Sequence, residues 1–158
     1  MTLTVLSPAG ERVQLNPQPL AQGGEARVHE VPAFPRAVVK LYHPEVLASR
    51  GDALRQKIEA MSTDPKLASL KKNSHLAWPL FGVRDEQGQW RGYAMGRVQG
   101  HALNKMAHAM AYREHWPALD RLAVVNYLLS LFSTLQQLQQ AGVLVGDYNP
   151  ANFLCDTS

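Results

Sequence analysis

The chain has 158 residues, 46% of them hydrophobic and 18% charged, which is enough apolar material for the core of one ordinary domain. This balance excludes an intrinsically disordered chain. The net charge of +3 is small, and so weak a basic excess argues against nucleic-acid binding by this segment. The single cysteine, Cys155, excludes an internal disulfide and a cysteine zinc cluster, and it is typical of a reducing compartment.

The sequence shows no sign of secretion or of membrane insertion. Residues 1–13 contain neither a basic stretch nor a long apolar stretch, so they do not resemble a signal peptide. No apolar run approaches the 18 residues that indicate a membrane-spanning helix. We therefore expect a soluble, cytoplasmic protein.

Short extended runs dominate the first hundred residues. Alternating or β-branched residues between turn signals favour strands over 2–6, 11–15, 20–31 with a turn at its glycine pair, 37–42, 76–83 and 90–98. Leu54, Ile58 and Met61 recur at helical spacing and predict a helix over 44–62. We expect a five-stranded antiparallel sheet with this one helix inserted.

The last third of the chain is expected to be helical. A short helix is predicted over 104–115 and a long one over 119–141, with Gly142 placed where a helix C-cap belongs. One face of the long helix is apolar, and its residues are Leu122, Val125, Leu128, Leu129, Phe132, Leu135 and Leu138.

Two features of the strand region could bind phosphate. Gly23 and Gly24 lie between two predicted strands, where the lack of a Cβ lets backbone N–H groups approach a phosphate; the simpler interpretation is a plain hairpin turn. Lys40 lies within an otherwise apolar strand. A buried ammonium is costly unless it is paired or liganded, although a lysine on an edge strand can also extend to solvent.

The stretch VLVGDYNPANFLC, residues 143–155, places Asp147 five residues before Asn152 between two apolar runs. The carboxylate could accept a proton from an attacking hydroxyl, and the amide oxygen could hold Mg²⁺ next to phosphate oxygens. The alternative is an Asx-turn that only connects a helix to a strand. The pattern by itself does not choose between these interpretations.

The order of these features along the chain resembles the protein-kinase-like superfamily over nearly its whole length. A glycine-rich hairpin, a strand lysine, a helix, a hairpin, a long helix and D-x-x-x-x-N follow one another as in kinases. More narrowly, KLYHPE, LAWPL, GYAMGRVQG and GDYNPANFL resemble a bacterial group of kinase-like proteins, some with C-terminal helix-hairpin-helix domains. The resemblance implies an α+β fold, with a kinase-like N-lobe over 1–98 and a partial C-lobe over 99–158 that ends just after the catalytic loop.

The resemblance also assigns roles to residues. Gly23 and Gly24 would belong to the nucleotide-covering loop, and Lys40 would grip the α- and β-phosphates. Asp147 would be the catalytic base and Asn152 a ligand of Mg²⁺. The remaining assignments are Val28 on the adenine base and the hinge over 95–100, with Met95, Gly96 and Val98 beside adenine. Glu59 is the candidate partner of Lys40, but another phase of the helix would turn Lys57 inward instead, and Glu45 is a poorer candidate.

Three departures from the kinase pattern qualify this resemblance. Ala21 and Ala26 replace the first and third loop glycines, and Val145-Gly146-Asp147 replaces H-R-D. The Asp of D-F-G, expected about a dozen residues after Asn152, lies beyond residue 158. The resemblance thus implies the N-terminal part of an ATP- and Mg²⁺-dependent serine/threonine-type kinase, inactive as these 158 residues. The alternative is a truncated pseudokinase that binds nucleotide or a protein partner, including a second copy through the 119–141 helix.

Overall fold

The computed structural model describes residues 3–156, and the chain forms two compact units that meet in sequence between Arg97 and Val98. This boundary falls within 95–100, the segment for which the sequence suggests a hinge. The first unit contains a curled antiparallel sheet with one long helix, and the second unit is mainly helical. The expected α+β class is confirmed.

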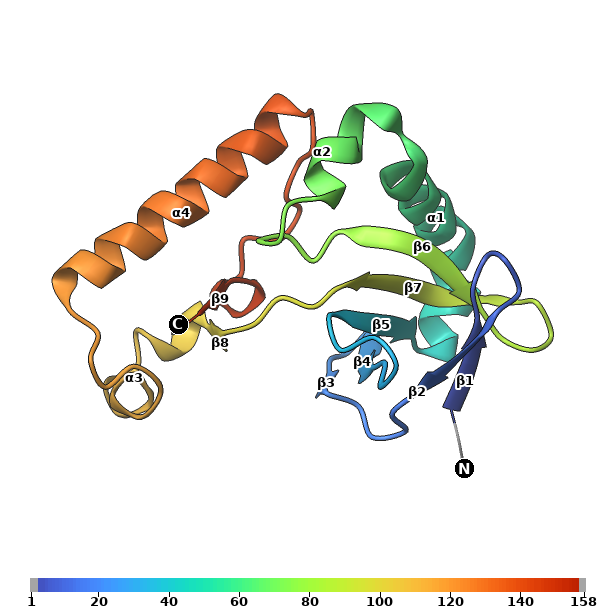
Figure 1. Cartoon of the computed structure of the whole chain (residues 1–158), viewed down its shortest axis with the longest axis horizontal. Helices are drawn as coiled ribbons and strands as arrows, with labels where there is room; N and C mark the ends of the chain where they lie inside the picture. Colours follow the sequence, from blue (N-terminus) through green and yellow to red (C-terminus); the bar gives the residue numbers. More distant parts are fainter. Residues whose placement is uncertain (1–2, 157–158) are drawn as a thin grey trace. The chain divides into compact units, whose positions relative to one another are not determined.

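The first unit contains a seven-stranded antiparallel sheet in the order β2-β1-β6-β7-β5-β4-β3 (Figure 1). Seven strands replace the five that the sequence predicted, because the N-terminal hairpin joins the edge of the sheet through the pairing of Leu6 with Arg84. The strands are β1 (Leu3–Leu6), β2 (Arg12–Leu15), β3 (Ala21–Gln22), β4 (Ala26–Glu30), β5 (Ala37–Tyr42), β6 (Pro79–Arg84) and β7 (Trp90–Gly96).

Helix α1 (Pro44–Thr63) packs against β6 and β7 and agrees closely with the predicted helix. Pro44 lies in its first turn, where the missing N–H costs no hydrogen bond. The helix is kinked at Arg50, which has a non-helical φ of −148° and precedes Gly51, a residue of low helix propensity. Two short helices that the sequence analysis missed follow it, η1 (Pro65–Leu67) and α2 (Ala68–Lys71).

Two apolar clusters form the core on the two faces of the sheet. One consists of Val5, Leu15, Val31, Val39, Val83 and Ala94, and the other of Ala26, Tyr42, Ile58 and Tyr93. Successive side chains of a strand point to opposite faces, so Lys40 lies on the same face as Tyr42. That face is covered by α1, since Ile58 belongs to the same cluster.

The second unit begins and ends on a small two-stranded sheet. β8 (His101–Ala102) pairs with β9 (Leu154–Cys155). Gly100 precedes β8 at a φ of +125°, and a Cβ there would lie 2.5 Å from the carbonyl oxygen of Cys155. The other elements are η2 (Leu103–Lys105), α3 (Ala109–His115), α4 (Arg121–Gln140) and η3 (Pro150–Asn152). The helix expected over 104–115 is therefore split, and its α-helical part begins only at Ala109.

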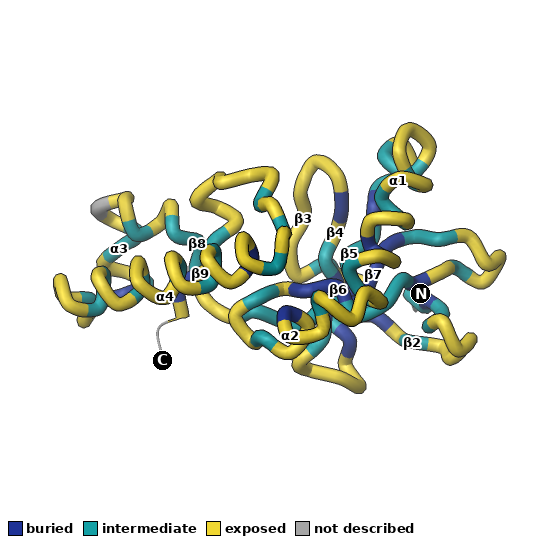
Figure 2. The backbone as a smooth tube through the Cα atoms, turned by 90° about the horizontal axis from the view of Figure 1, so that it is seen from above, coloured by how far each residue is buried: buried dark blue, intermediate teal, exposed yellow. Residues whose placement is uncertain are grey.

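Helix α4 exposes most of its length (Figure 2). Asp120 caps its N-terminus by accepting a hydrogen bond from the backbone N–H of Ala123 at 2.7 Å. Gly142, just beyond its end, has a φ of +75°, as the predicted C-cap requires. Five residues of the predicted apolar face are exposed, namely Leu122, Val125, Leu128, Leu129 and Phe132, while Leu138 is buried. Within residues 3–156, none of the helices has the length and apolar character needed to cross a bilayer.

Candidate functional site

The glycine pair forms the turn between β3 and β4. The N–H of Gly23 donates to the carbonyl of Ala26 at 2.9 Å, and the carbonyl of Gly23 contacts Nε2 of His43 at 3.0 Å. An added Cβ would meet nothing within 4 Å at either Gly23 or Gly24. Packing therefore does not require glycine at these two positions, and the simpler interpretation of the pair as a hairpin turn describes its geometry.

Lys40 lies in the middle of the sheet, paired with Val28 of β4 and Tyr93 of β7. Its Nζ is 5.3 Å from the centroid of the Tyr42 ring. Burial lowers the pKa of the ammonium below that of an ordinary lysine; Glu25 opposes this shift, whereas Lys57 and Arg50 add to it. A partly buried cation of this kind is stabilised by an anionic ligand.

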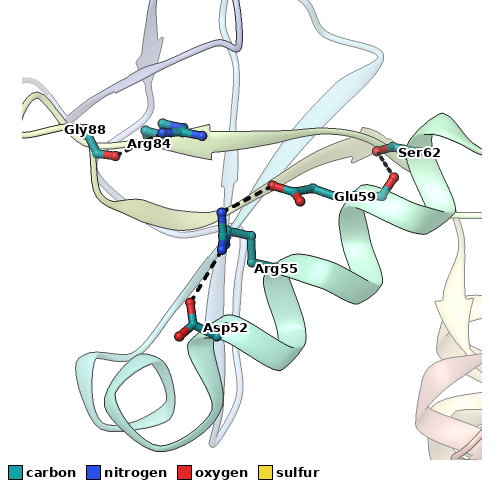
Figure 3. Close-up of polar contacts among 6 residues, drawn as sticks. All are labelled: Asp52, Arg55, Glu59, Ser62, Arg84 and Gly88. Carbon is teal, nitrogen blue, oxygen red and sulfur yellow. Dashed lines mark hydrogen bonds and ion pairs between the residues drawn. The ribbon is translucent and has the colours of Figure 1, made fainter.

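Glu59, the predicted partner of Lys40, forms a different ion pair in this structure. Its carboxylate lies 3.8 Å from Arg55, one helical turn away on α1 (Figure 3). The carboxylate that acts on Lys40 is that of Glu25, next to the glycine pair. The sequence analysis missed Glu25 because its contribution depends on how the β3–β4 turn folds back over β5. Ile58 is buried, as the predicted helix face requires.

The predicted adenine-binding segment continues from the end of β7. Met95 pairs with Val38 and packs partly buried against the Tyr42 cluster, and Gly96 pairs with Ala37. Val98 opens the second unit. The structure thus places Val28, Lys40, Met95 and Gly96 on three adjacent strands of one sheet, β4, β5 and β7.

Asp147 and Asn152 meet in the loop after α4. The side-chain Nδ2 of Asn152 donates to Oδ2 of Asp147 at 3.0 Å, and the backbone N–H of Asn149 donates to Oδ1 of Asp147 at 3.1 Å. Asn149 in turn accepts a hydrogen bond from the N–H of Ala151 at 2.9 Å. Two successive Asx-turns therefore hold the loop, so the simpler interpretation of this motif is also correct as a description of its geometry.

This hydrogen bond fixes the direction of the Asn152 amide. Because Nδ2 donates to Asp147, Oδ1 is the end of the amide that remains to accept or to ligate. Asp147 and Asn152 are both exposed, so solvent and ligands can reach them. A carboxylate and an amide oxygen are donors of the type that Mg²⁺ prefers. Within residues 3–156, however, no group of three or more His, Cys, Asp or Glu side chains could by itself hold a metal ion.

Comparison with known proteins bears on the fold. The sequence matches no protein-family profile and gives no significant match among curated proteins. Among solved structures, the chain is similar to the kinase domain of a Toxoplasma gondii specific rhoptry antigen, with a TM-score of 0.66 and 16% sequence identity. The chain has a protein-kinase-like fold. The match covers 99% of this chain and 50% of that one, so the chain spans about half the length of the kinase domain that it matches.

The two units of the chain can be compared with the two lobes of the kinase fold. The first unit corresponds to an N-lobe and the second to the start of a C-lobe, as the sequence analysis expected. The narrower resemblance to a bacterial group with helix-hairpin-helix domains stays a prediction, and so do the roles of the individual site residues.

Proposed function

We propose that this chain binds Mg²⁺-ATP and forms part of a serine/threonine-type protein kinase-like phosphotransferase. The observation that carries the proposal is the loop in which Asn152 donates to the carboxylate of Asp147. In a protein-kinase-like fold, this arrangement provides a base and a metal ligand from one turn. Lys40 adds a partly buried cation, and its lowered pKa is consistent with a site that is more stable with an anion bound.

Each residue has a definite task in the proposed reaction. Lys40 holds the phosphates of the nucleotide, and Asp147 accepts the proton of the attacking hydroxyl. Asn152 would hold Mg²⁺ through Oδ1, and the bound ion supplies charge neutralisation at the phosphates. Catalysis by such a site depends mainly on positioning and electrostatics.

Nucleotide binding tests the proposal directly. We expect Mg²⁺-ATP to bind the chain and to raise its melting temperature, and Lys40→Met to weaken binding about tenfold by removing a charge-assisted contact. Lys66→Met is the matched control, because Lys66 is exposed in η1 outside the β4, β5 and β7 strands. Calorimetry measures both variants. Equal weakening by the two substitutions, or no binding at millimolar nucleotide, would contradict the proposal.

Phosphate transfer is expected to be absent from these 158 residues alone. The kinase pattern requires the Asp of D-F-G as a second metal ligand, and these 158 residues do not include that motif. The measurement is incubation with labelled ATP and a generic protein substrate. Mg²⁺-dependent transfer that Asp147→Ala abolishes would show that this expectation is wrong.

The exposed face of α4 supports a second candidate function, that of a non-catalytic binding module. Leu122, Leu129 and Phe132 are each at least 60% exposed, and a contiguous apolar face of this kind is typical of an interaction surface. We propose self-association through this face, which sedimentation velocity would detect. Leu129→Gln should shift the chain toward monomer, whereas Gln136→Ala, an exposed and polar position of the same helix, should not. A monomer at all concentrations would exclude self-association through this face.

A further inference from the structure

A cavity of about 840 Å³ lies in the first unit, and none of the residues assigned to the proposed nucleotide site lines it. Its walls come from both sides of the kink in α1 and from the β6–β7 hairpin. The volume is within the range of small-ligand sites, roughly 300–1,000 Å³. Because the α1 kink at Arg50 sets the angle between the two helical segments that line the cavity, its shape is built into the fold.

Four arginines line this cavity, Arg50, Arg55, Arg84 and Arg91, against a single acidic lining residue, Asp52. Figure 3 shows Arg55 leaving α1 between Asp52 and Glu59, with Arg84 at the end of β6. Guanidinium groups present their N–H donors in a planar fork that matches phosphate and carboxylate oxygens. The lining therefore indicates an anionic ligand.

Three of the four guanidinium groups make only long contacts within the described residues. Arg55 lies 3.7 Å from Asp52 and 3.8 Å from Glu59, and Arg91 lies 3.7 Å from Asp85. These distances exceed the 2.7–3.2 Å of a good N–H···O hydrogen bond, so the carboxylates attract the arginines without saturating their donors. Arg50 differs, because it is tightly paired with Glu25.

Arg84 makes no carboxylate contact among residues 3–156. Its Nη1 donates to the carbonyl of Gly88 at 3.4 Å, a long hydrogen bond that leaves most of its five N–H donors available. A phosphoryl group has three acceptor oxygens and can form shorter, charge-assisted hydrogen bonds with several guanidinium groups together. Arg84 and Arg91, which flank the β6–β7 turn, are the best placed to provide them.

Apart from the polar side chains of Ser49 and Gln89, the rest of the lining consists of apolar residues and glycines. Pro44, Leu47 and Ala53 contribute from α1, and Trp90 contributes an indole from β7. Trp90 is held in place on its core side by Tyr42, whose ring centroid is 5.7 Å away. A free inorganic anion would leave this apolar wall unused, so the lining favours a ligand that joins an apolar group to an anionic one.

We propose that this cavity binds a phosphate monoester carried on an apolar group, with the phosphoryl oxygens on Arg84 and Arg91 and the apolar group against Trp90 and Leu47. The same chemistry could come from a free aryl or alkyl phosphate or from a phosphorylated residue of a peptide. The proposed ligand contacts are distinct from the proposed nucleotide site, since none of the residues assigned to that site lines the cavity. Arg50 alone connects the two, because it pairs with Glu25 and its charge acts on Lys40.

The proposal is tested by calorimetric titration of the whole chain with 1-naphthyl phosphate. We expect saturable binding that weakens about tenfold in Arg84→Gln and in Arg91→Gln, since each loses a charge-assisted contact. Arg36→Gln is the matched control: Arg36 is exposed, belongs to the same unit and does not line the cavity. 1-Naphthol should bind far more weakly than its phosphate. Melting curves of each variant show that the fold is retained.

Several results would overturn the proposal. The first is no binding at millimolar 1-naphthyl phosphate. The second is that Arg36→Gln weakens binding as much as Arg84→Gln and Arg91→Gln do. The third is loss of binding in Lys40→Met, which would place the ligand at the proposed nucleotide site instead. A second titration with a phosphotyrosine flanked by alanines identifies the source of the ligand. Tighter binding of the peptide than of the free ester indicates a phosphorylated polypeptide, and equal binding indicates a free ester; both support the site.

Discussion

At the scale of single residues, Lys40 and the pair Asp147–Asn152 show how far local sequence can indicate chemistry. An isolated lysine within an apolar strand has few ways to satisfy its charge, and the structure indeed leaves it half-buried beside Tyr42. The spacing of Asp147 and Asn152 brings their side chains into hydrogen-bond contact. Glu59, in contrast, could be located on a helix but not oriented, because a small rotation of that helix changes its neighbour.

The lowered pKa of Lys40 predicts a pH dependence of stability. The unfolded chain holds this proton more tightly than the folded chain, so the contribution of Lys40 to stability becomes more favourable as the pH rises toward the ordinary lysine pKa. We expect Lys40→Met to stabilise the chain at pH 7 and this advantage to shrink at pH 9.5. Urea unfolding at both values measures the difference, and comparing the two proteins cancels the titration of Tyr42 and Tyr93. An advantage that grows with pH would contradict the assignment.

At the scale of elements, the close pairing of β5 with β7 depends on Gly92, a residue without a side chain. Gly92 lies so close to β5 that a Cβ there would be 1.9 Å from the carbonyl oxygen of Lys40. The strand that presents Lys40 is therefore held at a fixed distance from its neighbour. The kink in α1 has a comparable role, since the helix on either side of Arg50 lines the arginine-rich cavity.

Substitution of Gly92 tests this close approach. We expect Gly92→Ala to lower the free energy of unfolding by about 3 kcal/mol, because the added methyl group must displace backbone in the centre of the sheet. Gly24→Ala is the control, because its Cβ would meet no atom within 4 Å; its effect should be about 0.5 kcal/mol or less. Denaturant unfolding gives both values. Similar effects of the two substitutions would show that β5 and β7 can separate without cost.

Helix α4 allows a matched comparison between its two sides. Leu138 is 7% exposed and Leu129 is 60% exposed on the same helix. Leu138→Ala should cost about 3 kcal/mol by removing buried methyl groups, whereas Leu129→Ala should cost about 0.5 kcal/mol or less. Hydrogen exchange of the α4 amides reports the change locally. Equal protection in the two variants would mean that Leu138 does not anchor the helix.

At the scale of the whole molecule, charge and composition limit the partners more than they identify them. The excess of basic residues is small, and a protein that neutralises few phosphates binds nucleic acid weakly. We expect a random DNA duplex to bind no tighter than about 10 µM at 150 mM salt, within the range of non-specific complexes. Fluorescence anisotropy measures this affinity. Nanomolar binding to one DNA sequence would contradict this expectation and indicate that the chain functions in nucleic-acid recognition.

The sequence by itself determined those features that depend on local order. Strand and helix periodicity, the C-cap at Gly142 and the Asx-turn loop of Asp147 and Asn152 involve residues that are close in the chain. The fixed succession of these features was enough to predict a kinase-like α+β fold, which the structural comparison supports.

Only the tertiary structure decided features that join distant residues. The pairing of Leu6 with Arg84 extends the sheet to seven strands, and Glu25 approaches Lys40 across a turn. The arginines of the cavity come from α1 and from the β6–β7 hairpin, about thirty residues further along the chain. Such contacts depend on how a helix packs on a sheet, and side-chain periodicity fixes which face is buried but not which residue across the contact it meets.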